Sequence, residues 1–400
     1  MLQYFAHMET TNYRKPHIPA LDGLRAAAVL IICWYHIWQQ SWLAPYLHIG
    51  GKTLSFDAVP RTGYLFVDLM LLLSAFLLFL PHAESMVYGT PAPAVGPFYK
   101  KRAARIVPSY YLAALTMFSV SLIAGKYGSF GEAFRDIGAT LTFTQTLSAQ
   151  TYIGTKVNGV LWTAAIEVAF YLMFPLLAKA FRKKPCLTWA GMTAIGLLYM
   201  EFMVIRREDI LRVSLNQLPA FAGVFANGMM ASYLYVLADK KLNRRRPWWV
   251  LAASTALFVA SVLAIRAGMN VAASTRTLQL TQAKLRYPMA LFFTTLVFSM
   301  SLGGKPFELI FGNRLMRFFA GISYNLYLWH QWLAVHLKEM RIPFWTGEKP
   351  PNMTGNILWQ RQYTALCFFV AIAVAVLLTY CFERPVARAL LKKRTSKEND

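Results

Sequence analysis

Apolar runs long enough to cross a membrane recur from one end of this 400-residue chain to the other. A helix that spans the hydrocarbon core of a bilayer needs about 20 mostly apolar residues. Hydrophobic residues make up 56% of the chain and charged residues only 15%, whereas soluble domains average about 45–50% and 25%. The sequence therefore predicts an all-α integral membrane protein with about ten transmembrane helices, near residues 24–40, 63–80, 107–124, 160–181, 187–205, 218–237, 248–267, 285–303, 318–337 and 362–382.

These runs follow one another without an intervening segment of soluble-domain size, which predicts one membrane domain over residues 1–400. Its transmembrane core covers about residues 20–388, and residues 389–400 form a short basic cytoplasmic tail. The first run is followed by bulky and polar residues rather than by a signal-peptidase site, so we expect it to remain as a helix. Residues 126–159 contain many Thr, Gln and Gly, and are expected to form a long extracytoplasmic loop, with a re-entrant segment as an alternative.

The net charge of +23 is spread over short basic clusters between the apolar runs. If the N-terminus is cytoplasmic, 25 of the 41 Lys and Arg residues lie on the cytoplasmic side of the predicted topology. That bias follows the positive-inside rule and predicts cytoplasmic N- and C-termini. The clusters match no nucleic-acid-binding module, so we expect membrane lipid and no nucleic acid as a partner.

The first predicted helix carries two polar residues on one face. Arg25 and His36 lie eleven residues apart, which corresponds to about 16 Å along a helix and to nearly the same direction around its axis. Asp22 is expected to cap the helix N-terminus, and Gly23 to allow the turn before it. An arginine at a membrane boundary commonly snorkels to lipid headgroups, but a histidine inside a membrane helix indicates a functional site.

Six stretches in this order resemble the acyltransferase-3 family of integral membrane acyltransferases. They cover residues 20 to 388, nearly the whole chain, and six in order are more specific than any one alone. The matching stretches are Leu21-Asp22-Gly23-Leu24-Arg25 with His36; Val67-Asp68-Leu69 with Ser74-Ala75-Phe76; Arg102 through Arg105-Ile106-Val107-Pro108 to Tyr110-Tyr111; Trp162, Glu167 and Phe170-Tyr171; Ser323-Tyr324-Asn325-Leu326-Tyr327-Leu328-Trp329-His330; and Phe382-Glu383-Arg384-Pro385.

The chain departs from the family pattern around Glu167. The second acid of the family's paired carboxylates is replaced by Val168, the following Gln by Ala169, and the glycine after Ser74 by Ala75. Glu167 therefore stands alone, which puts in doubt a mechanism that needs two adjacent carboxylates.

The resemblance implies a membrane O-acyltransferase of the cell envelope, located in a bacterial plasma membrane. It implies acyl-CoA, most often acetyl-CoA, as a co-substrate, with no tightly bound cofactor. The implied acceptor is a hydroxyl of a surface glycan or of a lipid-linked sugar. Because residues 1–400 include no esterase-like domain, the reaction is expected to be completed here or with a separate extracytoplasmic partner enzyme.

On this interpretation His36 is the catalytic residue, either as a general base or as an acyl carrier. Glu167 would orient its imidazole and stabilise the imidazolium cation. The donor phosphates would be held by three arginines, and four further residues would support the site. The donor-binding residues are Arg25, Arg102 and Arg105; the supporting residues are Asp68, Trp162, Tyr324 and His330.

Two of the supporting residues, Asp68 and Tyr324, also have an ordinary structural interpretation. Asp68 is as easily explained by helix capping as by chemistry, and Tyr324 is a common packing residue. Glu383 and Arg384 are expected to pair locally, and Pro385 to end the last helix. No metal-ligand spacing is present, so no metal site is predicted. A transporter or flippase of a small anionic or acylated substrate is the alternative function, because buried His, Glu and Arg also mark transport pathways.

Overall fold

Long α-helices account for nearly all of the chain, as the apolar runs predict. The structure is a computed structural model, and it describes residues 17–206 and 210–392. Residues 393–400, most of the predicted basic tail, lie outside the described residues. Ten long helices coincide with the predicted stretches: α2 (Pro19–Ser41), α4 (Phe66–Tyr88), α5 (Val95–Ile123), α8 (Trp162–Lys183), α9 (Pro185–Tyr199), α11 (Ala222–Lys241), α12 (Trp248–Ser274), α13 (Leu278–Leu302), α15 (Arg314–Glu339) and α16 (Ile357–Leu378). The predicted fold class is confirmed.

Within the described part of the chain, nine helical segments are long and apolar enough to cross a membrane. The tenth predicted helix, α15, is present with 26 residues, but polar side chains lower its hydropathy. Ser323, Asn325 and His330 are each at most 3% exposed. Helix α15 therefore turns its polar residues toward other helices rather than toward lipid.

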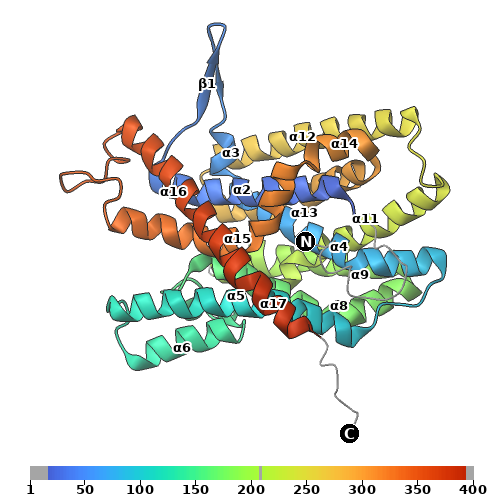
Figure 1. Cartoon of the computed structure of the whole chain (residues 1–400), viewed down its shortest axis with the longest axis horizontal. Coiled ribbons are helices and arrows are strands. Elements are labelled where there is room, and N and C mark those ends of the chain that lie inside the picture. The colour runs from blue at the N-terminus through green and yellow to red at the C-terminus, as the bar shows by residue number, and fades with distance from the viewer. Residues whose placement is uncertain (1–16, 207–209, 393–400) are drawn as a thin grey trace.

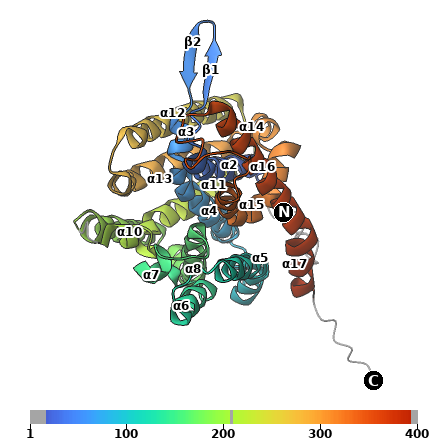
Figure 2. The same cartoon turned by 90° about the vertical axis from the view of Figure 1, so that its left-hand side faces the viewer.

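The bundle has two ends, which the connections between long helices define (Figure 1). The loop end carries the connections 42–62, 124–158 and 340–356. The basic end carries the connections 89–94 and 242–247, together with α14 (Gly304–Phe311) and α17 (Arg384–Leu391). A hairpin of β1 (Tyr46–Ile49) and β2 (Lys52–Ser55) projects away from the helices in both views (Figures 1 and 2).

Glycines allow the central helices to approach one another closely. A Cβ atom at Gly228 of α11 would lie 2.5 Å from the backbone oxygen of Leu72 in α4. A Cβ atom at Gly23 of α2 would overlap the backbone oxygen of Phe311 in α14. Small residues at helix contacts are the usual means of close packing inside membranes. Gly23 therefore serves helix packing and does not form the turn that the sequence predicted.

Residues 126–159 do not form an irregular loop. They contain α6 (Phe130–Leu141) and α7 (Ala149–Tyr152), and α6 folds back along α5 (Figure 1). The hydroxyls of Tyr110 and Tyr111, near the middle of α5, donate to the backbone oxygens of Thr140 (3.0 Å) and Leu141 (2.9 Å). Helix α6 thus ends beside the middle of α5, with its last carbonyl groups satisfied by protein.

Two predictions about helix ends are wrong. Asp22 does not cap α2, because the helix begins three residues earlier at Pro19, and its carboxylate instead lies 2.8 Å from His17 Nε2. Pro385 does not end the last helix, because α16 continues through a wide turn at Thr379–Glu383 into α17. Pro385 falls in the first turn of α17, where its missing N–H is tolerated.

Candidate active site

A cavity lies between five long helices and contains most of the predicted polar site residues. Helix α4 contributes an apolar wall that includes Met70 and Leu71. The polar side chains that line the cavity are Arg25 of α2, Ser74 of α4, Arg102 and Arg105 of α5, Thr163 and Glu167 of α8, and Ser323, Tyr324 and Tyr327 of α15. Residues far apart in the sequence thus share one space.

Glu167 is held by two hydroxyl groups in this cavity. The Ser74 hydroxyl donates to its Oε1 atom over 2.9 Å, and the Tyr171 hydroxyl donates to the same oxygen. The Arg102 guanidinium lies 5.9 Å from the centre of the Tyr171 ring. The carboxylate therefore belongs to the arginine-lined part of the site.

The three arginines come from two helices whose local sequence directs them inward. Arg102 and Arg105 are separated by three residues on α5 and therefore share one face of that helix. Tyr324 joins α5 to α15, because its hydroxyl donates to the backbone oxygen of Ile106 over 3.1 Å. Arg102 Nε is buried and has no hydrogen-bond partner among residues 17–206 and 210–392. Three guanidinium groups against one carboxylate make the cavity suited to an anionic ligand.

His36 lies outside this cavity, further toward the loop end of α2. Its Nδ1 atom is 3.0 Å from Gln39 Oε1 and 3.1 Å from Gln331 Nε2. Gln39 Oε1 accepts a hydrogen bond only from a protonated Nδ1, whereas Gln331 Nε2 donates only to an unprotonated Nδ1, so each contact belongs to a different tautomer of the neutral ring. No hydrogen bond within the described chain joins His36 to Glu167, so the expected carboxylate–imidazole pair is not formed.

His330 lies beside His36, with 5.1 Å between the ring centres. Its Nδ1 atom is 2.8 Å from the backbone oxygen of Tyr327 and 3.1 Å from that of Leu326. Two carbonyl acceptors require the proton to be on Nδ1. Its Nε2 atom is buried and unpartnered in the described chain, next to His36.

Tyr327 connects the cavity to the histidine pair. Its side chain lines the cavity, and its ring centre lies 5.7 Å from that of His330. The order along the site is therefore the arginine-lined cavity, Tyr327, His330 and His36. The cavity is nearer the basic end, and His36 is nearer the loop end.

Two of the predicted supporting residues lie away from the cavity. Asp68 of α4 forms an ion pair with Arg286 of α13 at 3.4 Å, and both side chains are 2% exposed. The Arg286 guanidinium also donates to the backbone oxygen of Leu215 (2.5 Å) and to Asn216 Oδ1 (3.1 Å). This geometry gives Asp68 a role in joining helices. Trp162, at the start of α8, stacks on Phe221 rather than lining the cavity.

The structure corrects the prediction for Glu383 and adds three residues that were not identified from the sequence: Arg286, Gln39 and Gln331. Glu383 does not pair locally, because its Oε2 atom accepts a hydrogen bond from Asn325 of α15 over 2.7 Å. Arg286 was not assigned a role from the sequence, although an arginine inside a predicted membrane helix is a usable signal. Gln39 and Gln331 gave no such signal, because an uncharged amide side chain does not by itself indicate a functional site.

The fold and this site define a multi-pass membrane protein with an arginine-lined cavity and two neighbouring histidines beyond it. The chain belongs to the acyltransferase-3 family, described as an acyltransferase domain, whose profile matches residues 18–381. That family membership makes the protein a membrane acyltransferase, and it does not support the transporter alternative.

Three similar proteins illustrate the range of the family. An acetyltransferase of Acidianus two-tailed virus, ORF330, is 24% identical over 81% of this chain and 85% of its own length. Nodulation protein 10 of Rhizobium leguminosarum bv. viciae is 24% identical over 60% of this chain and 66% of its own length. O-acetyltransferase OatA of Staphylococcus aureus strain NCTC 8325 is 29% identical over 41% of this chain, but the match spans only 25% of OatA. No solved structure matches the chain significantly.

Proposed function

We propose that this protein transfers an acyl group, in particular acetyl, from acyl-CoA to a hydroxyl of a cell-surface polysaccharide or lipid-linked sugar. The observation that carries the proposal is the convergence of Arg25, Arg102 and Arg105 on one cavity. A guanidinium binds phosphate through a planar fork of donors. Acyl-CoA carries several phosphates at one end and its reactive thioester at the other.

The distance between the arginines and His36 fits such an extended donor. Arg25 and His36 are eleven residues apart on α2, which is about 16 Å along the helix. Phosphates held at the arginines would leave the thioester to extend past Tyr327 toward His36. The apolar wall of α4 would lie along the uncharged part of the donor.

In the direct route, His36 Nε2 removes the proton from the acceptor hydroxyl as its oxygen attacks the thioester carbonyl carbon. A C–O bond forms, the C–S bond breaks, and the imidazolium returns the proton to the departing CoA thiolate. A neutral histidine is suited to this work near pH 7. In the covalent route, His36 Nε2 attacks the carbonyl carbon and CoA thiolate leaves. The acceptor oxygen then attacks the acyl carbon and the acyl–nitrogen bond breaks, while the hydroxyl proton passes to the CoA thiolate.

In this proposal, Glu167 acts on the arginine-lined cavity that holds the donor, here called the donor layer, rather than on the imidazole of His36. Its carboxylate balances part of the charge of the three arginines, and Ser74 and Tyr171 hold it there. This arrangement supports a role in positioning the arginines around the donor. Gln39 and Gln331 take over the orientation of His36.

The sidedness of the reaction is part of the proposal. The excess of Lys and Arg at the basic end supports a cytoplasmic location for that end, where acyl-CoA is available. The loop end and His36 would then face the outside of a bacterial plasma membrane, where the acceptor lies. A separate extracytoplasmic enzyme is proposed as a partner that completes the transfer.

The test uses membranes from cells with and without this chain, incubated with acetyl-CoA labelled in the acetyl group. The proposal expects label in alkali-labile esters of the envelope glycans, identified by mass analysis, only when the chain is present. Equal glycan labelling in both membranes, or uptake of label without ester formation, would contradict it.

A further inference from the structure

Unused hydrogen-bonding atoms are concentrated on one stretch of α15 next to His36. Five buried side-chain atoms within eight residues have no partner among the described residues. They are Trp329 Nε1, His330 Nε2, Gln331 Oε1, Trp332 Nε1 and His336 Nε2. A buried polar group without a partner costs about 1–3 kcal/mol, so such a cluster requires an explanation. One physical explanation is a bound ligand that supplies the missing hydrogen-bond partners.

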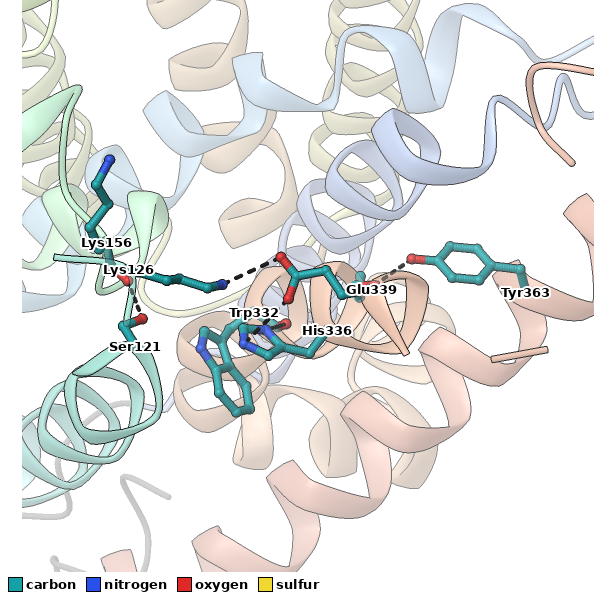
Figure 3. Close-up of polar contacts among 8 residues, drawn as sticks. Ser121, Lys126, Lys156, Trp332, His336, Glu339 and Tyr363 are labelled. Carbon is teal, nitrogen blue, oxygen red and sulfur yellow. Dashed lines mark hydrogen bonds and ion pairs between the residues drawn. The ribbon is translucent and has the colours of Figure 1, made fainter. Parts of the chain in front are cut away.

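The outer part of this stretch combines a flat aromatic stack with an ion pair (Figure 3). The rings of Trp332 and His336 are stacked, with 4.0 Å between their centres. Glu339 lies between this stack and Lys126, with 3.4 Å from its Oε1 atom to Lys126 Nζ (Figure 3). His336 Nε2 is 3.8 Å from Glu339 Oε2, beyond hydrogen-bond range. The Glu339 side chain is 50% exposed.

This outer part is joined directly to the proposed catalytic histidine. Gln331 Nε2 lies 3.1 Å from His36 Nδ1, and Trp332 is the next residue on α15. Glu339 lies two helical turns beyond Gln331, toward the loop end. The strip of Gln331, Trp332, His336 and Glu339, here called the α15 strip, thus leads from His36 to the exposed loop end.

We propose that the α15 strip binds the sugar of the acceptor and presents one of its hydroxyls to His36. This inference rests on the proposed function, and it names the residues and the ligand class of the acceptor side. Sugar hydroxyls both donate and accept hydrogen bonds, which matches an indole N–H beside imidazole, amide and carboxylate acceptors.

Other ligand classes fit the α15 strip less well. An acyl chain would leave the buried polar atoms unsatisfied. A phosphate group would meet the acceptors of Gln331, His336 and Glu339, and the cation Lys126 is already paired with Glu339. The charges of Lys126 and Glu339 cancel, which favours an uncharged, hydroxyl-rich ligand.

The test compares Trp332→Phe with Trp345→Phe. Both changes remove an indole N–H that has no partner in the described chain. Trp345 also lies at the loop end, but its ring packs on Trp359, with 5.5 Å between the ring centres, and belongs to a separate apolar cluster. Initial rates are measured with the purified chain and labelled acetyl-CoA. The acceptor probe is the unacetylated envelope glycan fraction of cells that lack the chain.

For Trp332→Phe, we expect the half-saturating glycan concentration to rise about fivefold to tenfold, the range for losing one hydrogen bond. The half-saturating acetyl-CoA concentration should stay unchanged, and so should both values for Trp345→Phe. If Trp332→Phe behaves like Trp345→Phe, the proposal is overturned. If the native chain transfers no label to the glycan fraction, the proposed function itself fails.

A second pair separates ligand binding by Glu339 from its ion pair with Lys126. Glu339→Gln and Lys126→Gln both remove the ion pair, but only Glu339→Gln removes the carboxylate. We expect Glu339→Gln to raise the half-saturating glycan concentration several times more than Lys126→Gln does. Equal effects of the two changes would assign Glu339 a structural role only and overturn its place in the α15 strip.

Discussion

Removal of either member of the buried Asp68–Arg286 ion pair should destabilise the protein, whereas removal of both should not. Each side chain is 2% exposed, so a single substitution leaves an uncompensated charge inside the protein. Breaking a buried pair in this way costs about 3–5 kcal/mol, whereas replacing both members by apolar residues is often neutral. The changes to compare are Asp68→Leu, Arg286→Met and the double variant.

The structure predicts that the two single changes differ. After Asp68→Leu, the Arg286 guanidinium keeps the acceptors Leu215 O and Asn216 Oδ1 and its position 4.0 Å from the Phe221 ring. The free energy of unfolding should therefore fall by an amount near the lower limit, about 3 kcal/mol. After Arg286→Met, Asp68 loses its one side-chain partner in the described chain, and the loss should approach about 5 kcal/mol.

The assay is the free energy of unfolding in mixed detergent micelles, together with acetyl transfer per folded molecule. The double variant should recover stability to within about 1 kcal/mol of the native chain and keep its activity. If the double variant is as stable as the native chain but inactive, the pair takes part in the reaction and its structural assignment is wrong.

Three further predictions concern the donor layer and the topology. Glu167→Gln should weaken acetyl-CoA binding several-fold, because the arginines lose the carboxylate that positions them, while turnover at saturating acetyl-CoA should fall less than tenfold, about 1.4 kcal/mol; a larger loss of turnover at native affinity would place Glu167 with the chemistry instead. Arg102→Lys should weaken acetyl-CoA binding less than Arg102→Ala, for which about 1.5–3 kcal/mol is expected, and the effect of Arg102→Ala should shrink at high salt; equal affinities would count against phosphate binding. An impermeant thiol reagent should label cysteines placed at Thr53 and Gln150 from outside, and one at Asn243 only after permeabilisation; the reverse pattern would invert the proposed topology.

The helical membrane fold could be predicted from the sequence because its cause is local. An apolar run of about 20 residues has few alternatives to a membrane helix, and all ten predicted stretches are helical. The helix ends were less predictable, since Pro385 interrupts or begins a helix depending on where the hydrogen-bond register shifts. The fold of α6 depends on Tyr110 and Tyr111, which are distant in sequence.

The candidate site was only partly predictable, for a related reason. Charged residues within apolar runs can be recognised from the sequence as candidate site residues, and the three arginines and Glu167 do line one cavity. The hydrogen-bond partner of each side chain depends on the tertiary structure, however. Nothing local in the sequence indicates that Glu167 bonds Ser74, or that Gln331 rather than a carboxylate reaches His36. The unpartnered atoms of the α15 strip are likewise visible only once the helices are assembled.

Donor binding and chemistry are proposed to occupy separate parts of this site: the arginine-lined cavity binds the donor, and His36 carries out the transfer. The most direct test of this separation is the affinity for acetyl-CoA, measured by calorimetry on purified Arg25→Ala, Arg102→Ala, Arg105→Ala and His36→Ala variants, alongside turnover. The account predicts that each arginine variant binds acetyl-CoA about tenfold or more weakly, whereas His36→Ala binds it nearly as well as the native chain and transfers nothing. Native affinity in all three arginine variants, with loss of binding in His36→Ala alone, would contradict the account.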